Sequence, residues 1–563
     1  MPLGIITPLM TWEETRTGRN DPREPLPVRR GLVALAFLFV GVLFAFGVYH
    51  HYFLGDDCFI SFRYARHLVD GEGLVWNPGE RVEGYTNFLW VLLMAGSLFI
   101  GIPPEVSSVS MGVASGTGLL LALLLFSAHR WGWDDPFIWV APLALAANRS
   151  FTGWSTGGLE TMFFTLLVFL AFTVYLRERD RDSSIPVVSS LLFAMAALTR
   201  PEGLLFVCIA GVLFVVEILR RKRSLRAGLV WAAPCALIVG THLLWRHAYY
   251  GAWLPNSFYA KVPGAWWEQG WRYLTLFADD YRIVWFLPLA VASVVMGRRF
   301  VHVLFAGTVT AYLVYVAGVG GDRFEFRFLV VVFPYTYWLI TDGVRRIVGL
   351  GAAMARFRRL LRTFGFAVVA ALVLTTLGAS LRSVADEPRY GIASLEVIRD
   401  YAKRRADAGK FLMRLIDIGV LPGDVILGAS GAGALPYYTD WPTVDLLGIN
   451  DKTVARMPII DRGIIGHERW APYDYLLKRQ VVILDTFNRV VFDENILDGR
   501  SRFRDYGSTP VLLKAYRVDD KYLIFGSLVP DEELVRVFGR LESVVPEATT
   551  PLSVFGRSDK LGE

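Results

Sequence analysis

Charged residues are scarce in this sequence of 563 residues. Asp, Glu, Lys and Arg make up 20% of the chain, whereas hydrophobic residues make up 54% and the mean hydropathy is +0.41. Soluble domains carry about 25% charged and about 45–50% apolar residues. The apolar excess is concentrated in runs of roughly 15–20 residues, and a helix needs about 20 such residues to span a bilayer. The composition therefore excludes a soluble enzyme, a disordered chain and a porin-like barrel.

Cysteine and nucleotide-binding motifs are equally scarce. The three cysteines, Cys58, Cys208 and Cys235, have no spacing typical of a disulfide framework or a zinc site. The segment GASGAG (428–433) lacks the spacing of a dinucleotide-binding loop, and the lone His467 has no second histidine placed to share a metal ion. No P-loop is present. We therefore expect no nucleotide cofactor and no coupling to a nucleoside triphosphate.

The net charge of +6 comes with arginines that are grouped between the apolar runs. This grouping is typical of cytoplasmic loops and does not indicate a nucleic-acid partner. Five arginines precede the first apolar run, 31–49, and Asp56 and Asp57 follow it. The positive-inside rule therefore places a tail of residues 1–30 in the cytoplasm and the Asp pair outside. Strict alternation places the later basic clusters in the cytoplasm as well: 177–182, 220–226, 297–299 and 345–362.

The expected membrane domain, residues 31–381, contains about 11 spans by this alternation. An odd number of crossings must separate the Asp pair from the basic cluster at 177–182. Four apolar runs lie between them, at 87–101, 109–127, 136–147 and 161–176. One of these runs therefore does not cross. It is either 136–147, whose helix reaches only about 18 Å, or 87–101, which would then lie along the membrane surface.

Residues 382–563 contain no spanning run and lie outside by the same alternation. Apolar stretches at 424–430, 444–450 and 481–487 are separated by Gly, Pro and Asp turns, and 393–416 has a helical pattern. We therefore predict an all-α polytopic membrane bundle with a C-terminal extracytoplasmic α/β domain. The protein is expected in the plasma membrane as a multi-pass protein with a cytoplasmic N-terminus.

Asp56 and Asp57 are the first candidates for catalysis. Acidic residues at this position can cap a helix that begins near Cys58. A carboxylate at the membrane–water boundary can also act as a general base or bind a metal ion that holds a phosphate. Adjacent side chains point in different directions, so one of the two can react while the other orients it. No cofactor is required by these residues, and a divalent cation stays an open alternative.

Further polar clusters gather at the outer ends of the spans. Individually, such residues can be anchors that extend toward the lipid headgroups or part of an interfacial aromatic belt. Collectively, their presence on one face of one bundle indicates a site. The residues that we predict to bind an anionic head group are Arg63, Arg200, Lys261 and Arg327, and those that we predict to contact the rest of the substrate are Tyr85, Asn87, Glu160, Glu202, Asn256 and Asp322.

An external site beside lipid, with carboxylates and arginines, fits a substrate that is half lipid and half anionic head. A polyprenyl-phosphate sugar has this character, and its glycosyl–phosphate bond stores the driving force for transfer. Catalysis needs a base for the acceptor hydroxyl, cations for the departing phosphate and stabilisation of an oxocarbenium-like sugar. A transporter of lipid-linked sugar would instead place polar groups near the bilayer midplane.

The sequence also resembles a known family. DDCFISFRYARHLVDGEGLVWNPGERVEGYTNFLW is followed by STGGLE, LTRPEG, YYGAWLPNSFYAK, GDRFEFRFL and GALPYYTDWPTVDLLGINDKTVA, over about residues 31–470. These motifs are similar to those of the GT-C membrane glycosyltransferases. They are most similar to the terminal β-(1→2)-arabinofuranosyltransferases, which use decaprenyl-phosphoryl-arabinofuranose to build arabinogalactan and lipoarabinomannan.

The resemblance implies a catalytic aspartate in the first external loop, here Asp56 or Asp57, and a C-terminal extracytoplasmic domain at 382–563. It also favours 87–101 as the run that lies along the membrane. The implied reaction transfers a sugar, best matched by arabinofuranose, from a polyprenyl-phosphate donor to a cell-envelope glycan. Because related chains of this pattern handle other sugars, a protein or lipid glycosyl ligase of the same superfamily stays an alternative, as do both stereochemical outcomes.

Overall fold

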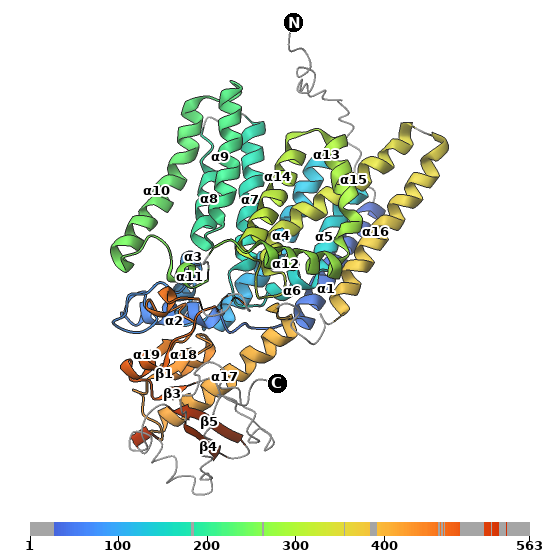
Figure 1. The fold of residues 1–563 in the computed structure, drawn as a ribbon. Helices are drawn as coiled ribbons and strands as arrows, with labels where there is room; N and C mark the ends of the chain where they lie inside the picture. Colours follow the sequence, from blue (N-terminus) through green and yellow to red (C-terminus); the bar gives the residue numbers. More distant parts are fainter. Residues whose placement is uncertain are drawn as a thin grey trace.

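The computed structural model describes residues 27–181, 185–261, 264–353, 355–382, 391–459, 462, 466, 468–484, 512–518, 521–527 and 536–537. Most of the predicted cytoplasmic tail and the histidine at 467 lie outside the described residues. The described chain forms a helical bundle and a smaller α/β unit that packs against one end of it (Figure 1). Hydrogen bonds between residues 56–77 and residues 434–443 join the two parts.

The bundle is built from the apolar runs predicted from the sequence. These runs are helical because a backbone surrounded by lipid must satisfy its hydrogen bonds internally. Its core is aromatic: Trp338 stacks on Trp131 with ring centroids 5.3 Å apart and also contacts Phe126 and Phe305. The long and medium helices are α1 (Pro27–His50), α4 (Pro104–Trp131), α7 (Thr161–Asp180), α8 (Val187–Thr199), α9 (Gly203–Leu219), α10 (Leu225–Tyr250), α13 (Leu287–Gly297), α14 (Phe300–Val319), α15 (Phe333–Ala353) and α16 (Arg358–Leu381).

The basic clusters meet at one end of the bundle, as the alternation predicts. The turns from α9 to α10, from α13 to α14 and from α15 to α16 all lie at the end opposite the α/β unit (Figure 1). Two arginines of these clusters form ion pairs with neighbouring segments there: Arg179 contacts Glu217, and Arg345 contacts Asp135 at 2.6 Å. We call this end the basic end, and the end beside the α/β unit the site end.

The number of spans stays a prediction. Among the described residues, six helices are long and apolar enough to cross a membrane, or seven if the bent pair of α12 (Trp267–Tyr281) and η2–α13 counts as one span. Shorter apolar helices such as α8 and α9 fall below this length criterion although they lie within the bundle. The helices that meet this length criterion are therefore fewer than the eleven predicted spans, and the shorter helices leave that prediction untested.

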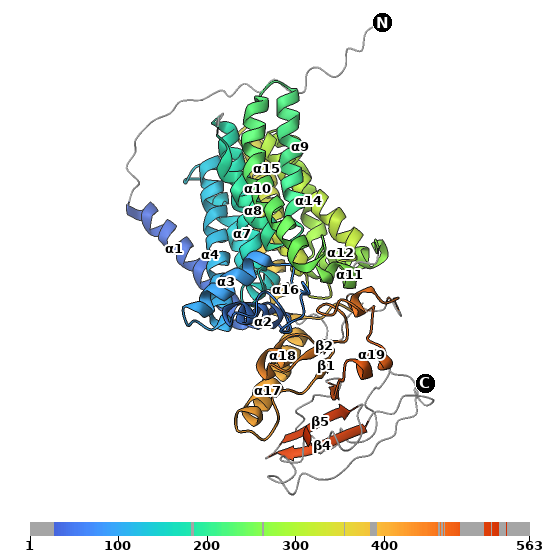
Figure 2. The same cartoon turned by 90° about the vertical axis from the view of Figure 1, so that its left-hand side faces the viewer.

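The arrangement favours 87–101 as the run that does not cross. The helix α3 (Phe88–Phe99) lies beside α2 (Cys58–Val69) at the site end in both views (Figures 1 and 2). The run 136–147, which forms η1 (Pro136–Trp139) and α5 (Val140–Ala146), instead connects the two ends. It begins beside Asp135, which pairs with Arg345 at the basic end, and ends before Arg149, which pairs with Glu325 at the site end.

Short helices cover the site end. These are α2, α6 (Arg149–Trp154), α11 (Asn256–Lys261), α12 and the 3-10 helix η3 (Arg327–Val332). Helix α12 begins a bent pair with α13, and the two are inclined by 76°. Asn148 caps α6 by accepting a hydrogen bond from the Phe151 amide at 2.9 Å, which satisfies one of the free amides of the first turn.

The α/β unit begins with α17 (Leu395–Asp417). It continues through β1 (Leu427–Ala429), α18 (Ala434–Thr439), β2 (Thr443–Asp445), α19 (Tyr473–Lys478), β3 (Ile483–Leu484), β4 (Leu512–Val518) and β5 (Lys521–Ser527). The sheet order is β2-β1-β3-β5-β4, with β1 parallel to β2 and β3, and β5 antiparallel to β3 and β4.

The second expected strand is shorter than the apolar stretch 444–450 predicts, because β2 ends at Asp445. The Asp445 carboxylate accepts hydrogen bonds from the backbone amides of Leu447 and Asn450, at 3.0 and 2.8 Å. Such local bonds turn the chain and compete with a continuing strand. The turn carries residues 447–450 toward the bundle.

Candidate active site

A pocket of about 270 Å³ opens at the site end of the bundle. Its walls come from α2, the loop 84–87, residues 159–160, the turn between α8 and α9, α11 and the loop 321–328. Segments far apart in the sequence therefore meet at one place. Nine predicted site residues line it: Asp57, Tyr85, Asn87, Glu160, Arg200, Glu202, Lys261, Asp322 and Arg327. The other three, Asp56, Arg63 and Asn256, make their contacts elsewhere.

One wall of the pocket is a continuous chain of hydrogen bonds. Arg200 donates to Glu202 (Nε–Oε1 2.6 Å) and to Glu160 (Nη1–Oε1 2.7 Å). The second oxygen of Glu160 accepts from Asn87 Nδ2 at 2.7 Å, and Asn87 Oδ1 accepts from Ser61 on α2 at 3.2 Å. All five side chains are buried. Because each group has a charged or amide partner, this wall is preorganised and does not need to rearrange around a ligand.

Local sequence positions the two arginine-bearing turns. Pro201 disfavours a helical conformation for Arg200, whose φ of −151° and ψ of 142° end α8 and direct its side chain away from the helix axis. In the second turn, Gly320 and Gly321 have φ of 93° and 78° and end α14. Residues with a Cβ rarely adopt this left-handed conformation, so the two glycines allow the chain to reverse before Asp322.

Three further cations line the same pocket. Arg327 Nε donates to Asp322 Oδ2 at 2.7 Å, and Arg323 and Lys261 also line the pocket. Burial lowers the pKa of Lys261, and the negative charge of Asp57 is the largest effect that opposes this shift. Cations concentrated in a cavity that is partly shielded from water attract an anionic group more strongly than exposed cations do.

Asp56 and Asp57 differ in burial and in their contacts. Asp57 is half-buried and lines the pocket. Asp56 is 5% exposed, accepts a hydrogen bond from the Ala434 amide at the start of α18 (2.9 Å) and lies 3.6 Å from Arg405. A Cβ at Gly433 would overlap the Asp56 carbonyl. The glycines of GASGAG therefore allow the α/β unit to approach Asp56. Both carboxylates line a small cavity on this side, and of the two Asp57 also lines the larger pocket.

A second, smaller cavity lies between the pocket and the α/β unit. Asp57, Lys261 and Arg323 line both cavities. The side that faces the α/β unit contains Tyr401 from α17 and Asp445 from the end of β2. Burial raises the pKa of Asp445 to about 6. Asp57 therefore lies between the larger pocket and the carboxyl ends of the parallel strands, where ligands bind in open α/β sheets.

Arg63, which we predicted to bind an anionic head group, lines neither of these two cavities. Its guanidinium is fully buried and donates to three backbone carbonyls: Trp76 at 2.6 Å, Trp441 at 3.0 Å and Pro436. These carbonyls belong to the first external loop and to the α/β unit. Buried arginine is stable only where its donors are satisfied, and this arginine is satisfied by holding two parts of the protein together.

Asn256 has a comparable structural role. Its Nδ2 donates to the carbonyls of Gly448 and Ile449 at 2.9 and 3.0 Å, and its backbone amide donates to the Glu83 carbonyl at 2.7 Å. Its side chain therefore joins α11 to the loop after β2. The neighbouring Lys261, five residues along the same helix, is held over the pocket by this anchor.

Sequence reasoning missed three charged residues that shape the site. Arg323 was recognised in the motif GDRFEFRF but was not assigned a role, although it lines both cavities. Arg405 contacts Asp56 from α17, where the run AKRRAD reads as a solvated helix face. Arg149 pairs with Glu325 behind the pocket. Its place between Asn148 and Ser150 gave no signal for this pairing.

Among the described residues, no group of three or more His, Cys, Asp or Glu side chains is placed to hold a metal ion. Glu160, Glu202 and Asp322 contact arginines instead. The divalent cation considered from the sequence therefore has no assigned ligands.

The chain is similar to known proteins in two ways. Two proteins named terminal β-(1→2)-arabinofuranosyltransferase match 46% of it. The relative from Mycobacterium tuberculosis is 29% identical over 272 residues, or 42% of its own length. The relative from Corynebacterium glutamicum is 28% identical over 283 residues, or 40% of its own length. The alignment thus spans less than half of either relative. Residues 398–529 match a family described as a domain of unknown function (DUF8728).

The structure is also similar to that of ArnT from Cupriavidus metallidurans. The alignment with the crystal structure of ArnT bound to undecaprenyl phosphate covers 88% of this chain and 98% of the ArnT chain, with a TM-score of 0.56 and 12% identity. The alignment with the apo structure of ArnT has a TM-score of 0.55 and 12% identity, and it covers 89% of this chain and 98% of ArnT. At this identity the likeness establishes the fold. The predicted helical bundle is confirmed as a fold similar to that of ArnT, and the resemblance to the arabinofuranosyltransferases is confirmed as a sequence similarity over about half the chain.

Proposed function

We propose that this protein is a GT-C glycosyltransferase that moves a sugar from a polyprenyl-phosphate donor to a glycan acceptor. One observation carries the proposal: Asp57 faces a pocket whose walls hold Arg200, Lys261, Arg323 and Arg327 at one end of an apolar bundle. A lipid-linked phosphate needs cations next to a membrane, and the acceptor hydroxyl needs a base beside them. The names of the relatives and the fold of ArnT support the same reaction class.

In this reaction Asp57 is the general base. It accepts the proton of the acceptor hydroxyl while the acceptor oxygen bonds to the anomeric carbon of the sugar. The bond from that carbon to the phosphate oxygen breaks, and the polyprenyl phosphate leaves with the bonding electron pair. Lys261, Arg323 and Arg327 would stabilise the charge that develops on the departing phosphate. Glu160, Asn87 and Glu202 would orient the sugar, because they belong to the preorganised wall of the same pocket.

Arabinofuranose is the sugar that we propose, and a cell-envelope glycan is the acceptor that we propose. The two relatives support this choice by name. A ligase that transfers another sugar to a protein or lipid would use the same pocket, so the donor has to be identified directly.

The decisive experiment offers purified protein, in sealed lipid vesicles, a panel of polyprenyl-phosphate sugars that includes decaprenyl-phosphoryl-arabinofuranose, together with an arabinan oligosaccharide as the acceptor. Released polyprenyl phosphate and sugar transfer are both measured, with Asp57→Asn as the inactive control. We expect release from the arabinofuranose donor only with wild type. Release from no donor contradicts the proposal, and movement of intact donor between leaflets without release would identify a transporter.

We also propose that the site end faces the outside of the plasma membrane. Two variants test this orientation in intact cells, in a background in which Cys208 is replaced by Ala. Ile418→Cys, at a position that is 70% exposed in the α/β unit, should react with an impermeant maleimide. Lys222→Cys, at an exposed position of the basic end, should react only after lysis. The reverse pattern would invert the topology and contradict the proposed location of the reaction.

A further inference from the structure

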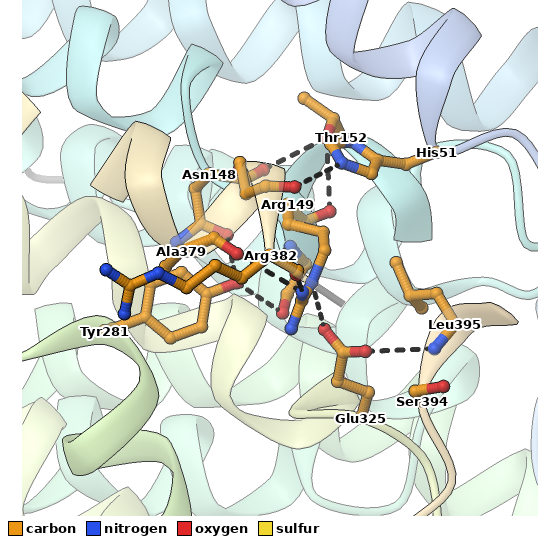
Figure 3. A network of polar contacts seen from close by, with 12 residues as sticks. His51, Asn148, Arg149, Thr152, Tyr281, Glu325, Ala379, Arg382, Ser394 and Leu395 are labelled. Carbon is orange, nitrogen blue, oxygen red and sulfur yellow. Dashed lines mark hydrogen bonds and ion pairs between the residues drawn. The ribbon is translucent and has the colours of Figure 1, made fainter. Parts of the chain in front are cut away.

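A buried ion pair lies behind the pocket and is not used in the proposed reaction. Arg149 on α6 donates through Nε to Glu325 Oε1 at 2.7 Å, and the two side chains are 2% and 1% exposed (Figure 3). Neither residue lines the pocket or the smaller cavity. Glu325 lies within the loop that carries Arg323 and Arg327, so its contacts decide where those two arginines are held.

Glu325 fixes this loop to the segment that precedes α17. Its second carboxylate oxygen accepts from the Leu395 amide at 2.9 Å (Figure 3). Its backbone amide donates to the Ala393 carbonyl at 3.0 Å, and the Ala393 amide donates to the Arg323 carbonyl at 2.7 Å. On the other side, Trp154 Nε1 of α6 donates to the Glu325 carbonyl at 2.8 Å. Both the side chain and the backbone of Glu325 are therefore held.

Helix α17 extends from this point to the Asp pair. Ser394 caps the helix by accepting from the Val397 amide at 3.3 Å. Arg405, ten residues after Leu395 and hence about 15 Å along the helix, lies 3.6 Å from Asp56 and donates to the Gly431 carbonyl at 2.7 Å. One helix thus joins the position of Glu325 to the position of Asp56, whose neighbour Asp57 is the proposed base.

Helix α6 makes a second connection between the same two places. Arg149 Nη1 donates to the Ala379 carbonyl at 3.2 Å, at the end of α16. His51 contacts Thr152 of α6 (Nδ1–Oγ1 2.9 Å) and the Ser380 carbonyl (3.1 Å), and it lies five residues before Asp56 (Figure 3). The loop of cations and the Asp pair are therefore linked on both sides through Arg149 and Glu325.

We propose that Arg149 and Glu325 form a positioning pair that, together with α17, sets the distance between the phosphate-binding arginines and Asp57. This inference rests on the proposed function. Neither residue touches substrate. Their effect on the reaction is exerted through Arg323 and Arg327 on one side and through α17 on the other. A displacement of about 1 Å between reacting groups can lower a rate by about 10²-fold, so a pair that fixes this distance affects turnover more than binding.

The test compares Glu325→Gln with Asp342→Asn as a matched control. Asp342 on α15 is an equally buried carboxylate that contacts Arg346 and His302, but it lies toward the basic end. Each variant is examined for thermal stability, for kcat and donor KM, and for hydrogen exchange of the peptides 320–328 and 391–397. Glu325→Gln retains an acceptor for Leu395 but loses the charge that pairs with Arg149.

For Glu325→Gln we expect kcat to fall by about 10²-fold with a smaller change in KM, and exchange to rise in both peptides together. Asp342→Asn should lower thermal stability comparably and leave kcat and both peptides near wild type. Arg149→Lys, which keeps the charge, should lower kcat less than Glu325→Gln does, and it also keeps the test decisive if Glu325→Gln does not fold. An equal loss of kcat in the control, or faster exchange in one peptide alone, would overturn the proposal. If wild type transfers no sugar, the proposed function fails separately, while the exchange data still test the pair.

Discussion

The two ends of the bundle contain similar buried ion pairs but different surroundings. At the basic end, Asp342 accepts from Ser293 on α13 at 2.8 Å, from His302 on α14 at 3.0 Å and from Arg346 on its own helix. At the site end, Arg200 contacts Glu160 and Glu202, and all three also line a pocket of about 270 Å³. Burial and pairing are common to both ends. The pocket beside the charges distinguishes a site from a structural contact between helices.

Among the single changes considered, Asp57→Asn should cause the largest loss of sugar transfer. Losing a general base lowers a rate by about 10²–10⁴-fold, and Asp57 is half-buried, so we expect little change in thermal stability. Asp342→Asn should show the opposite pattern, because breaking a buried pair costs about 3–5 kcal/mol. Transfer and melting temperature are measured for both variants in parallel. Wild-type turnover in Asp57→Asn would contradict the assignment of the base.

Asp56→Asn sharpens the same comparison within the site. Burial raises the pKa of Asp56, and Arg405 opposes this shift. Because Asp56 contacts the start of α18 and does not line the larger pocket, we expect a lower melting temperature and a loss of transfer smaller than that of Asp57→Asn. Partial proteolysis of the α/β unit reports the same weakening. Complete loss of transfer at unchanged stability would instead assign a chemical role to Asp56.

Arg200→Lys tests whether the wall of the pocket needs the planar guanidinium. Lysine cannot hold Glu160 and Glu202 in the same fork geometry, and a hydrogen bond to a charged group contributes about 1.5–3 kcal/mol. We therefore expect the donor KM to rise about tenfold or more. Arg346→Lys, the matched change at the basic end, should leave the donor KM near wild type. If both variants match wild type at limiting donor, the wall does not recognise the donor.

The smallest effect is the pH dependence of donor use. Because burial lowers the pKa of Lys261, its ammonium loses the proton at a lower pH than an exposed lysine does. As pH rises, the site loses one cation, and the donor KM should increase within the alkaline range. Lys261→Arg should remove this increase, because arginine stays protonated. The donor KM is measured from pH 7 upward for both proteins, and identical profiles would show that Lys261 does not hold the phosphate.

Much of the site was predictable because polar residues are rare near apolar runs. Arg200, Glu160 and Glu202 stand at the ends of spans, and the structure brings them into one hydrogen-bonded wall. The same signal failed for Arg63 and Asn256. Both also lie at the predicted membrane boundary, but their side chains donate hydrogen bonds to backbone carbonyls of the α/β unit. A charge pattern shows that a residue is near the boundary and does not show which partner satisfies it.

The sequence by itself predicted the helices and the grouping of basic clusters at one end, because hydrophobicity and charge act locally along the chain. Only the tertiary structure decided which aspartate lines the larger pocket. Asp56 and Asp57 are adjacent and chemically equal, and they differ because the start of α18 and Arg405 contact one of them. The structure also decided that Glu325 and Arg149 lie behind the cations, since contacts between residues 176 positions apart leave no periodic trace in the sequence.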